Sequence, residues 1–152
     1  MSDHIYTYAI HIATTPEKLW EALTSNDFWQ QYWGGEWKIE SDWKAGSGVK
    51  FFSRDGSFYS EGEVLESDPP NAVAYTWPLP EAERGEAPPE RLFWKITASG
   101  PGTVKLTLVH DRLTQEWYDS VGGGWPMILS SLKTLLETGK TLAFNREGQS
   151  VA

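Results

Sequence analysis

The sequence predicts an α+β helix-grip fold, in which a curved antiparallel sheet of about six or seven strands wraps on one long C-terminal helix, with two short helices after the first strand. Most of the chain between residues 37 and 110 consists of short segments in which apolar and polar residues alternate. Tight turns separate these segments, which is typical of antiparallel strands. A segment with helical periodicity closes the chain, so the apolar face of each strand is expected to pack on that helix.

The N-terminal residues predict one strand and two short helices. In residues 5–13 every second side chain is large and apolar, which is typical of a half-buried strand. Thr15 is then expected to cap a helix that has Pro16 at its first position. A second helix is expected from residue 26 to a stop at Gly34 and Gly35. It carries four aromatic residues in six, more than one helical face can bury, so some are expected to reach a pocket rim or a partner surface: Phe28, Trp29, Tyr32 and Trp33.

The first strands of the central region are predicted from alternation and from one turn signal. Residues 37–44 carry Trp37 and Trp43 on one face and only charged residues on the other, which predicts a strand. Asp55 and Gly56 then favour a two-residue hairpin turn between strands at 49–53 and 57–66, because such a turn demands positive φ.

Three further strands are expected around residues 73–77, 92–96 and 104–108, each with its large apolar residues on one face. Between the first two, residues 78–90 contain Pro, Gly and acidic residues and almost nothing to bury. We expect a mobile loop there.

The closing helix is predicted to begin near Pro126, because proline is tolerated in a first helical turn and residues 122–124 are three freely turning glycines. Thr114 is expected to cap a separate short helical turn before it. The tail from residue 145 is polar and is expected to fray. One apolar face extends along the helix at three- and four-residue spacing: Trp125, Ile128, Leu129, Leu132, Leu135 and Leu136.

Length and composition bound the class of protein. A chain of 152 residues predicts one domain over residues 1–144. The absence of cysteine excludes disulfides and thiol chemistry, and the absence of a recognisable secretory signal favours the cytoplasm. No apolar run is long enough to span a membrane. A net charge of −8 without a basic stripe makes a nucleic-acid partner unexpected.

Several short segments, in this order and spacing, resemble the bacterial single-domain branch of the activator-of-heat-shock-protein-90-ATPase homologue family. This family belongs to the START-like (SRPBCC, birch-pollen-allergen-like) superfamily. The resemblance extends from about residue 5 to 142. It rests on residues 14–24 (TTPEKLWEALT), 63–70 (EVLESDPP), 75–77 (YTW), 109–111 (VHD), 124–126 (GWP) and 129–133 (LSSLK). The resemblance implies a deep apolar cavity between the sheet and the last helix, whose ligand differs among members of the superfamily.

The inward-facing aromatic residues either line such a cavity or fill a core that curves around one helix. We place a candidate ligand site among them, on residues from four parts of the chain: Phe28, Trp33, Tyr75, Trp77, Trp94, His110, Trp125 and Leu129.

His110 is the most notable ionisable residue. Its position in the alternation puts it on the inward face with Leu106 and Leu108, where it is either a polar anchor or acid–base group, or a histidine bonded to backbone or water. His4 and His11 are seven residues apart on one strand and so face opposite sides, and a zinc site is not expected. No catalytic triad and no cofactor motif is present.

Three functional hypotheses follow. The first is a non-enzymatic binding protein for a small hydrophobic molecule of lipid, aromatic or polyketide-like character. The second is a cyclase or hydratase that uses His110 as general acid and base. The third is a chaperone-related interaction module that uses residues 28–33 as its contact surface, and a homodimer is compatible with any of the three.

Overall fold

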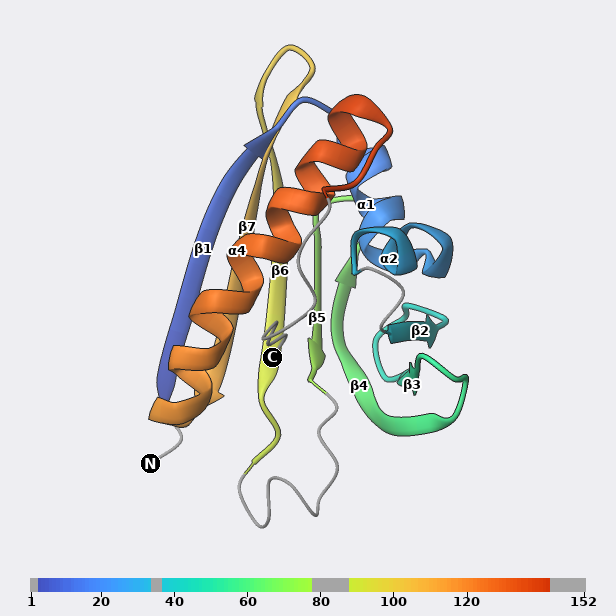
Figure 1. The fold of residues 1–152 in the computed structure, drawn as a ribbon, viewed down its shortest axis with the longest axis vertical. Helices are drawn as coiled ribbons and strands as arrows, with labels where there is room; N and C mark the ends of the chain where they lie inside the picture. The colour runs from blue at the N-terminus through green and yellow to red at the C-terminus, as the bar shows by residue number, and fades with distance from the viewer. Residues whose placement is uncertain (1–2, 34–36, 78–87, 143–152) are drawn as a thin grey trace.

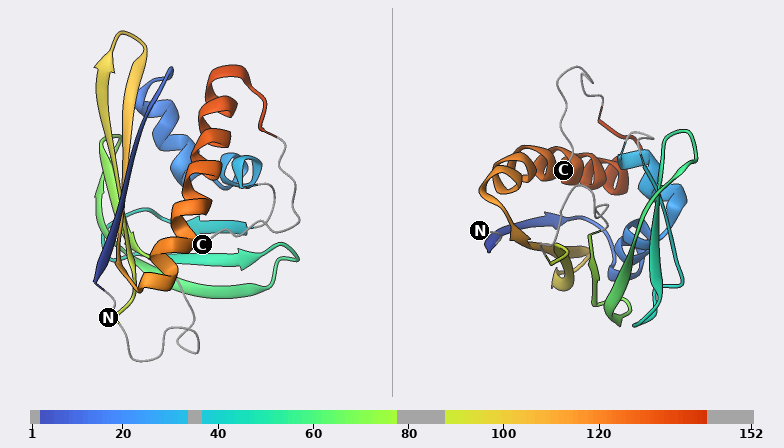
Figure 2. Two further views of the ribbon diagram at one scale, coloured as in Figure 1. Left: turned by 60° about the vertical axis from the view of Figure 1, so that its left-hand side comes forward. Right: turned by 90° about the horizontal axis from the view of Figure 1, so that it is seen from below.

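The computed structural model describes residues 3–33, 37–77 and 88–142, and its strands form one antiparallel sheet with the helices on one face (Figures 1 and 2). The strand order is β1-β7-β6-β5-β4-β3-β2, so β2 to β7 form a meander and β1 is added beside β7. This confirms the predicted helix-grip. The strands are β1 (His4–Ile12), β2 (Trp37–Ser41), β3 (Gly48–Ser53), β4 (Phe58–Asp68), β5 (Ala72–Thr76), β6 (Arg91–Gly100) and β7 (Thr103–Leu113); the helices are α1 (Pro16–Thr24), α2 (Asn26–Tyr32) and α4 (Gln115–Thr138).

The N-terminal elements form as predicted. Burial alternates residue by residue along β1, as expected for a strand with one covered face. The Thr15 hydroxyl accepts the backbone N–H of Lys18 at 3.2 Å, and Pro16 occupies the first turn of α1. Helix α2 ends at Tyr32, and its predicted glycine stop lies outside the described residues.

Two turns near β2, β3 and β4 differ from their predictions. Strand β2 ends at Ser41, and Trp43 lies beyond it with a φ of 56°, so the predicted strand over 37–44 is too long. The β3–β4 hairpin has a three-residue loop over 54–56, because Ser53 N–H donates to Ser57 O at 2.9 Å and only Gly56 has positive φ in that loop. The predicted two-residue turn is therefore wrong, since it would need positive φ at Asp55 as well.

Helix α4 is one continuous helix from Gln115 to Thr138, so the predicted start near Pro126 is wrong. Thr114 caps this whole helix and not a separate turn, because its hydroxyl accepts the N–H of Trp117 at 3.1 Å. Pro126 lies in the helix interior, where it cannot donate the usual hydrogen bond one turn back.

Packing explains why the helix continues through residues 122–124. Val121, Gly124 and Trp125 are buried and extend the apolar face of the C-terminal half toward the N-terminus. A Cβ built on Gly122 would lie 3.8 Å from the Tyr6 ring, so the helix runs close to β1 here. Burial of this face outweighs the helix propensity lost at each glycine, about 1 kcal/mol.

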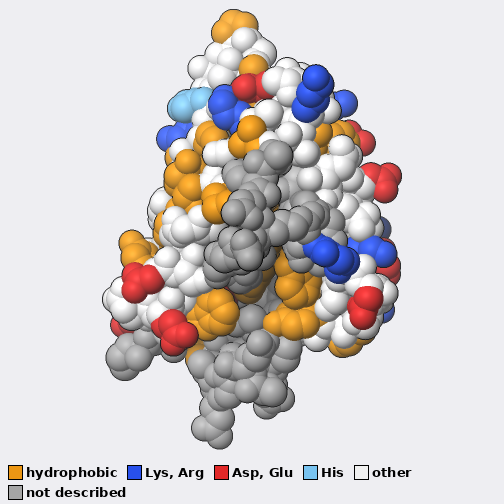
Figure 3. Space-filling model, in the orientation of Figure 1, with side chains coloured by type: hydrophobic (Ala, Val, Ile, Leu, Met, Phe, Trp, Pro, Cys, Tyr) orange, Lys and Arg blue, Asp and Glu red, His pale blue; other side chains and the backbone are white. Residues whose placement is uncertain are grey.

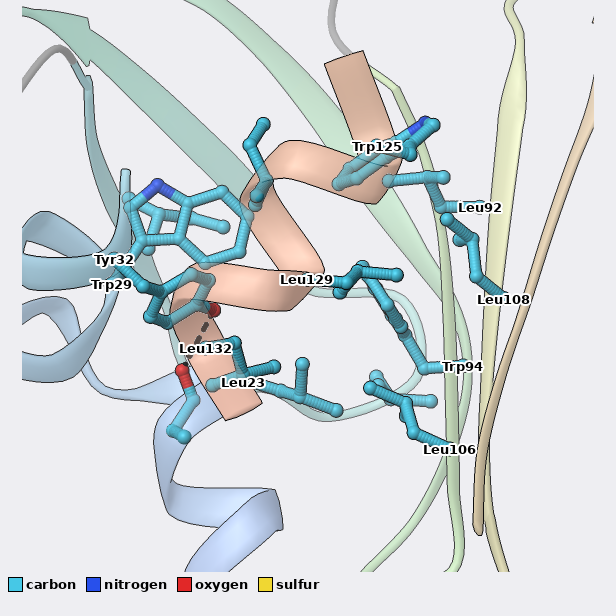
Figure 4. Packing of buried hydrophobic residues seen from close by; sticks show 14 of the residues in the cluster. Leu23, Trp29, Tyr32, Leu92, Trp94, Leu106, Leu108, Trp125, Leu129 and Leu132 are labelled. Atoms are coloured by element: carbon cyan, nitrogen blue, oxygen red, sulfur yellow. Dashed lines mark hydrogen bonds between the residues drawn. The ribbon is translucent and has the colours of Figure 1, made fainter. Parts of the chain in front are cut away.

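The core lies between α4 and the sheet, with α1 and α2 closing one end. Figure 1 shows α4 lying diagonally over β1, β7 and β6, and Figure 2 shows the three helices on one side of the sheet. In Figure 4, Trp29 and Tyr32 reach from α2 toward one side of α4, while Trp94 and Leu106 approach its other side from the sheet. The candidate site therefore lies where α2, α4 and the sheet converge.

Candidate functional site

Five of the nine tryptophans meet between α2, α4 and the sheet. No member of this tryptophan cluster exposes more than 6% of its surface. Neighbouring ring centroids are 5.1 to 6.2 Å apart. Such spacings are typical of attractive stacked and edge-to-face aromatic pairs. The tryptophan cluster consists of Trp29, Trp33, Trp77, Trp94 and Trp125.

Each member of the tryptophan cluster comes from an element whose local structure fixes its direction. Trp29 and Trp33 are one helical turn apart at the end of α2, and their rings stack with an interplanar angle of 19°. Trp77 directly follows β5 and donates its backbone N–H to Glu90 O at 2.7 Å. Trp125 comes from the middle of α4 and contacts three other members of the tryptophan cluster edge-on.

A buried polar network lies against this cluster. His110 on β7 is 0% exposed, and its Nε2 is 2.8 Å from Glu90 Oε1. The indole N–H of Trp125 donates to His110 Nδ1 at 3.1 Å. Because an indole N–H can only donate, Nδ1 must be the unprotonated nitrogen. Nε2 therefore carries the proton of a neutral imidazole and donates it to the Glu90 carboxylate.

Both ring nitrogens of His110 are thus engaged within the protein. The bonds join α4, β7 and the residue that precedes β6, so His110 holds these elements in register. The imidazole has no free lone pair with which to accept a proton from a ligand while the bond from Trp125 is intact. In this arrangement His110 acts as a positioning residue.

A β-bulge lies beside His110. His4 pairs with Leu113 and Tyr6 pairs with His110, so β7 has one residue more than β1 over this stretch. Arg112, within the bulge, has a φ of 61° and donates to Pro89 O at 3.2 Å.

The residue that follows Glu90 is also tied to β7. Arg91 Nε donates to Asp111 Oδ1 at 3.0 Å. Because the residues on either side of Glu90 are both bonded to β7, the carboxylate is directed at His110.

Two indole N–H groups of the tryptophan cluster have no acceptor among the described residues. Within the described residues, Nε1 of Trp29 and Nε1 of Trp33 are buried and make no hydrogen bond. Trp94 differs, because its N–H donates to Tyr75 Oη at 3.2 Å. An unsatisfied buried donor costs about 1–3 kcal/mol, so each of these two groups lowers the stability of the fold.

Two buried tyrosines near the site stay neutral. Burial raises the pKa of Tyr75, and the hydrogen bond from Trp94 only partly opposes that rise. Burial, with a smaller contribution from Tyr75, also raises the pKa of Tyr32 well above its usual value. Tyr32 Oη donates to Ala22 O at 2.8 Å, which fixes α2 against α1.

The structure brings most of the candidate site residues together. Direct ring contacts join Trp33, Trp77, Trp94, His110 and Trp125. Tyr75 joins them through its bond with Trp94, and Leu129 is buried on the side of α4 that faces Trp94 (Figure 4).

Phe28 is placed differently from the other candidates. It is half-buried, and the ammonium of Lys18 lies 5.7 Å from its ring centroid, between α1 and α2. Trp29, Tyr32 and Trp33 are all at least 95% buried. Of these four aromatic residues, only Phe28 is thus available to an outer surface, because α2 is covered by α1, α4 and β2 together.

Sequence reasoning missed Glu90, which it placed in a loop with almost nothing to bury. Residues 78–87 of that predicted loop lie outside the described residues, but Glu90 is 7% exposed and part of the site. The signal was the alternation of β6: Glu90 has the same parity as Leu92 and Trp94, which face inward.

Other kinds of site find little support among the described residues. No group of three or more metal-ligating side chains occurs among residues 3–33, 37–77 and 88–142. His4 packs against the Tyr118 ring, whereas His11 Nδ1 lies 3.2 Å from Ser99 Oγ. Nor does the described part of the chain contain a helix of the length and apolarity that a membrane crossing requires.

A curved antiparallel sheet that grips one long C-terminal helix, with two short helices closing one end over a buried aromatic site, defines a START-like helix-grip protein. The family model described as "Activator of Hsp90 ATPase homolog 1-like protein" matches residues 13–137. The chain belongs to this family. No curated protein sequence matches it.

Solved structures confirm the fold. A Mesorhizobium loti protein is 23% identical with a TM-score of 0.74, over 88% of this chain and 97% of that one. The Aha1 dimer from Colwellia psychrerythraea is 23% identical with a TM-score of 0.70, over 90% and 98%. An HSP90 activator from Plasmodium falciparum is 18% identical with a TM-score of 0.71, over 88% and 96%.

Proposed function

We propose that residues 1–144 form a single cytoplasmic binding domain that holds a small hydrophobic molecule between the sheet and α4, against the tryptophan cluster. The observation that carries this proposal is the tryptophan cluster itself, five buried indoles from α2, β6, α4 and the end of β5. Large aromatic surfaces with a few fixed polar groups are typical of sites for small apolar ligands. Trp33, Trp77 and Trp125 would supply the main contacts.

The face that α4 covers also carries apolar side chains at its surface. Figure 3 shows hydrophobic side chains along α4 and in the lower centre of this face, with charged side chains scattered among and around them. A hydrophobic molecule could approach over such a surface without displacing a layer of tightly hydrated charges.

The hydrogen bonds of His110 favour binding over catalysis. A general base needs a free lone pair within reach of its substrate, and both nitrogens of this imidazole are already bonded. Use of His110 as acid and base would require Trp125, and with it part of α4, to move away. The cyclase or hydratase hypothesis therefore has less support.

Tryptophan fluorescence during titration with lipids, flavonoids and polyketide-like compounds tests the proposal. At least one compound is expected to quench the emission saturably and to raise the melting temperature. Trp33→Leu is expected to weaken its binding by about tenfold or more, since a large buried contact is lost. Trp37→Leu is the matched control, because Trp37 is only partly buried and packs on Tyr59, 4.8 Å away.

A library without any compound that quenches or stabilises the protein would contradict the proposal. Equal loss of affinity in Trp33→Leu and Trp37→Leu would also count against it. Circular dichroism of both variants shows whether the fold is retained in each.

A chaperone-related role is a second candidate, favoured by the two solved relatives described as an Aha1 dimer and an HSP90 activator. The surface first expected for it is not accessible, because three of the four aromatic residues at 28–33 are buried. Immobilised protein that retains purified HSP90 and changes its ATPase rate would support this role. Size-exclusion chromatography with light scattering tests the homodimer in the same preparation.

A further inference from the structure

We propose that the ligand is a flat aromatic molecule with a neutral carbonyl oxygen that accepts a hydrogen bond from Nε1 of Trp33. This inference rests on the proposed function and adds the chemical class of the ligand. The supporting observation is which polar groups in and around the tryptophan cluster are hydrogen-bonded and which are not.

The free polar groups of the cluster are donors. Trp33 is 5% exposed and stands at the centre of the tryptophan cluster, in contact with Trp29, Trp77 and Trp125. Its indole N–H and that of Trp29 have no acceptor within the described residues. Because an indole N–H cannot accept, a hydroxyl or amine proton of a ligand would find no partner at either group. An acceptor oxygen would satisfy a donor whose burial otherwise costs free energy.

Each of the neighbouring acceptors already takes one hydrogen bond. His110 Nδ1 accepts from Trp125, Glu90 Oε1 accepts from His110, and Tyr75 Oη accepts from Trp94. At His110 a ligand donor would have to displace the bond from Trp125, whereas an acceptor at Trp33 displaces none.

The charges near the cluster favour a neutral acceptor over a carboxylate or phosphate. The ring of His110 is 6.0 Å from that of Trp77, and the Glu90 carboxylate is bonded to Nε2 of His110. The ring contacts and hydrogen bonds of the cluster, within the described part of the chain, include no lysine or arginine. An anion would thus lie near a buried negative charge without a compensating cation.

The ring planes favour a flat partner. Trp29 and Trp33 are inclined by 19°, and Trp33 and Trp77 by 24°, so each of these two pairs is stacked. A planar aromatic body can extend this arrangement by stacking, with its carbonyl directed at the N–H in the ring plane of Trp33.

Matched pairs of compounds with and without the carbonyl test the inference. The probes are 1-indanone against indane, and 9-fluorenone against fluorene, with affinity measured by calorimetry. Each ketone is expected to bind about three- to tenfold more tightly than its hydrocarbon, the worth of one hydrogen bond to a buried donor. In ¹⁵N-labelled protein the ketone is expected to move the Trp33 indole N–H resonance further downfield than the hydrocarbon does.

Two variants localise the effect. Trp33→Phe retains a stacking ring without an N–H, and is expected to bring the ketone-to-hydrocarbon ratio close to one. Trp94→Phe loses an N–H that is already bonded to Tyr75, so it is expected to retain the ratio even if both affinities fall. The wild-type resonance keeps the test decisive if either variant fails to fold.

The outcomes separate this inference from the proposed function. Equal affinity for ketone and hydrocarbon, with no selective shift of the Trp33 resonance, would overturn the inference and leave a binding protein for hydrophobic molecules. Tighter binding of carboxylated analogues than of ketones would overturn it as well. If neither member of either pair binds and the wider library also fails, the proposed function falls and this inference falls with it.

Discussion

Replacing Glu90 with leucine is expected to lower the free energy of unfolding by about 2–3 kcal/mol, because it leaves a buried N–H of His110 without an acceptor. Leucine has a similar size and is more apolar than glutamate. Loss of packing therefore contributes little, and the change isolates the hydrogen bond.

The magnitude follows from the geometry of the bond. His110 is 0% exposed, so water cannot replace the lost acceptor without opening the core. An orphaned buried donor costs about 1–3 kcal/mol, and bonds to a charged group lie toward the upper end. Glu90→Gln keeps an acceptor of the same shape and loses only the charge assistance. Its cost is expected to be about 1 kcal/mol or less, because burial of the carboxylate was itself unfavourable.

Urea denaturation followed by tryptophan fluorescence measures both changes through the midpoint at constant slope. Glu66→Leu is the control, because Glu66 is exposed on β4 and its replacement is expected to change stability by no more than about 0.5 kcal/mol. The reasoning is refuted if Glu90→Leu is as stable as Glu90→Gln. It is equally refuted if imidazole ¹⁵N spectra place the proton of His110 on Nδ1.

Three further predictions concern a helix, two buried tyrosines and a charged contact at the end of β1. Gly123→Ala is expected to stabilise the protein by about 0.5–1 kcal/mol, since a Cβ there meets nothing within 4 Å. Gly62→Ala is expected to destabilise it by about 2–3 kcal/mol, because its Cβ would lie 2.4 Å from the backbone carbonyl oxygen of Thr76 on β5. Similar urea midpoints for the two variants would contradict this. Tyr32 and Tyr75 are expected to stay protonated in the folded protein at pH 11. Because folding raises their pKa values, the free energy of unfolding is expected to fall as pH rises above about 10, by up to about 1.4 kcal/mol per pH unit for each group. Ultraviolet titration that ionises all six tyrosines together without unfolding would contradict this prediction. Folding lowers the pKa of Glu137 through hydrogen bonds from Lys133 and from the backbone N–H of Ala13. The resulting stabilisation, at most about 1 kcal/mol, is present above the unfolded pKa and is lost as pH falls below about 4. Glu137→Gln should therefore lower the urea midpoint at pH 7 but not at pH 3, and an equal loss at both values would disprove the assignment.

The strands were predictable because alternation is a local property of the sequence. In β1, every second side chain is covered, as the spacing of Tyr6 and Ile12 required. The helical conformation of residues 122–124, in contrast, does not follow from the local sequence. Three glycines and a proline favour a break by intrinsic propensity, and only the packing of α4 against β1 decides otherwise.

The candidate site was partly predictable for the same reason. Parity placed His110 and Trp94 on the inward face, and the structure confirms this. The partners of His110 depend on pairing between β6 and β7 and on the bulge at Arg112. Neither the pairing nor the bulge can be predicted from the periodicity of the sequence. Glu90 could have been found by extending the alternation of β6 by one step, but it ends a segment rich in proline, glycine and acidic residues, and that composition predicts a loop.

The tryptophan cluster has an optical consequence. Indoles whose centroids lie 5 to 6 Å apart exchange excitation far faster than they emit, so Trp33, Trp77 and Trp125 behave as one coupled chromophore. A single quenching contact at any one of these rings would therefore reduce the emission of all three.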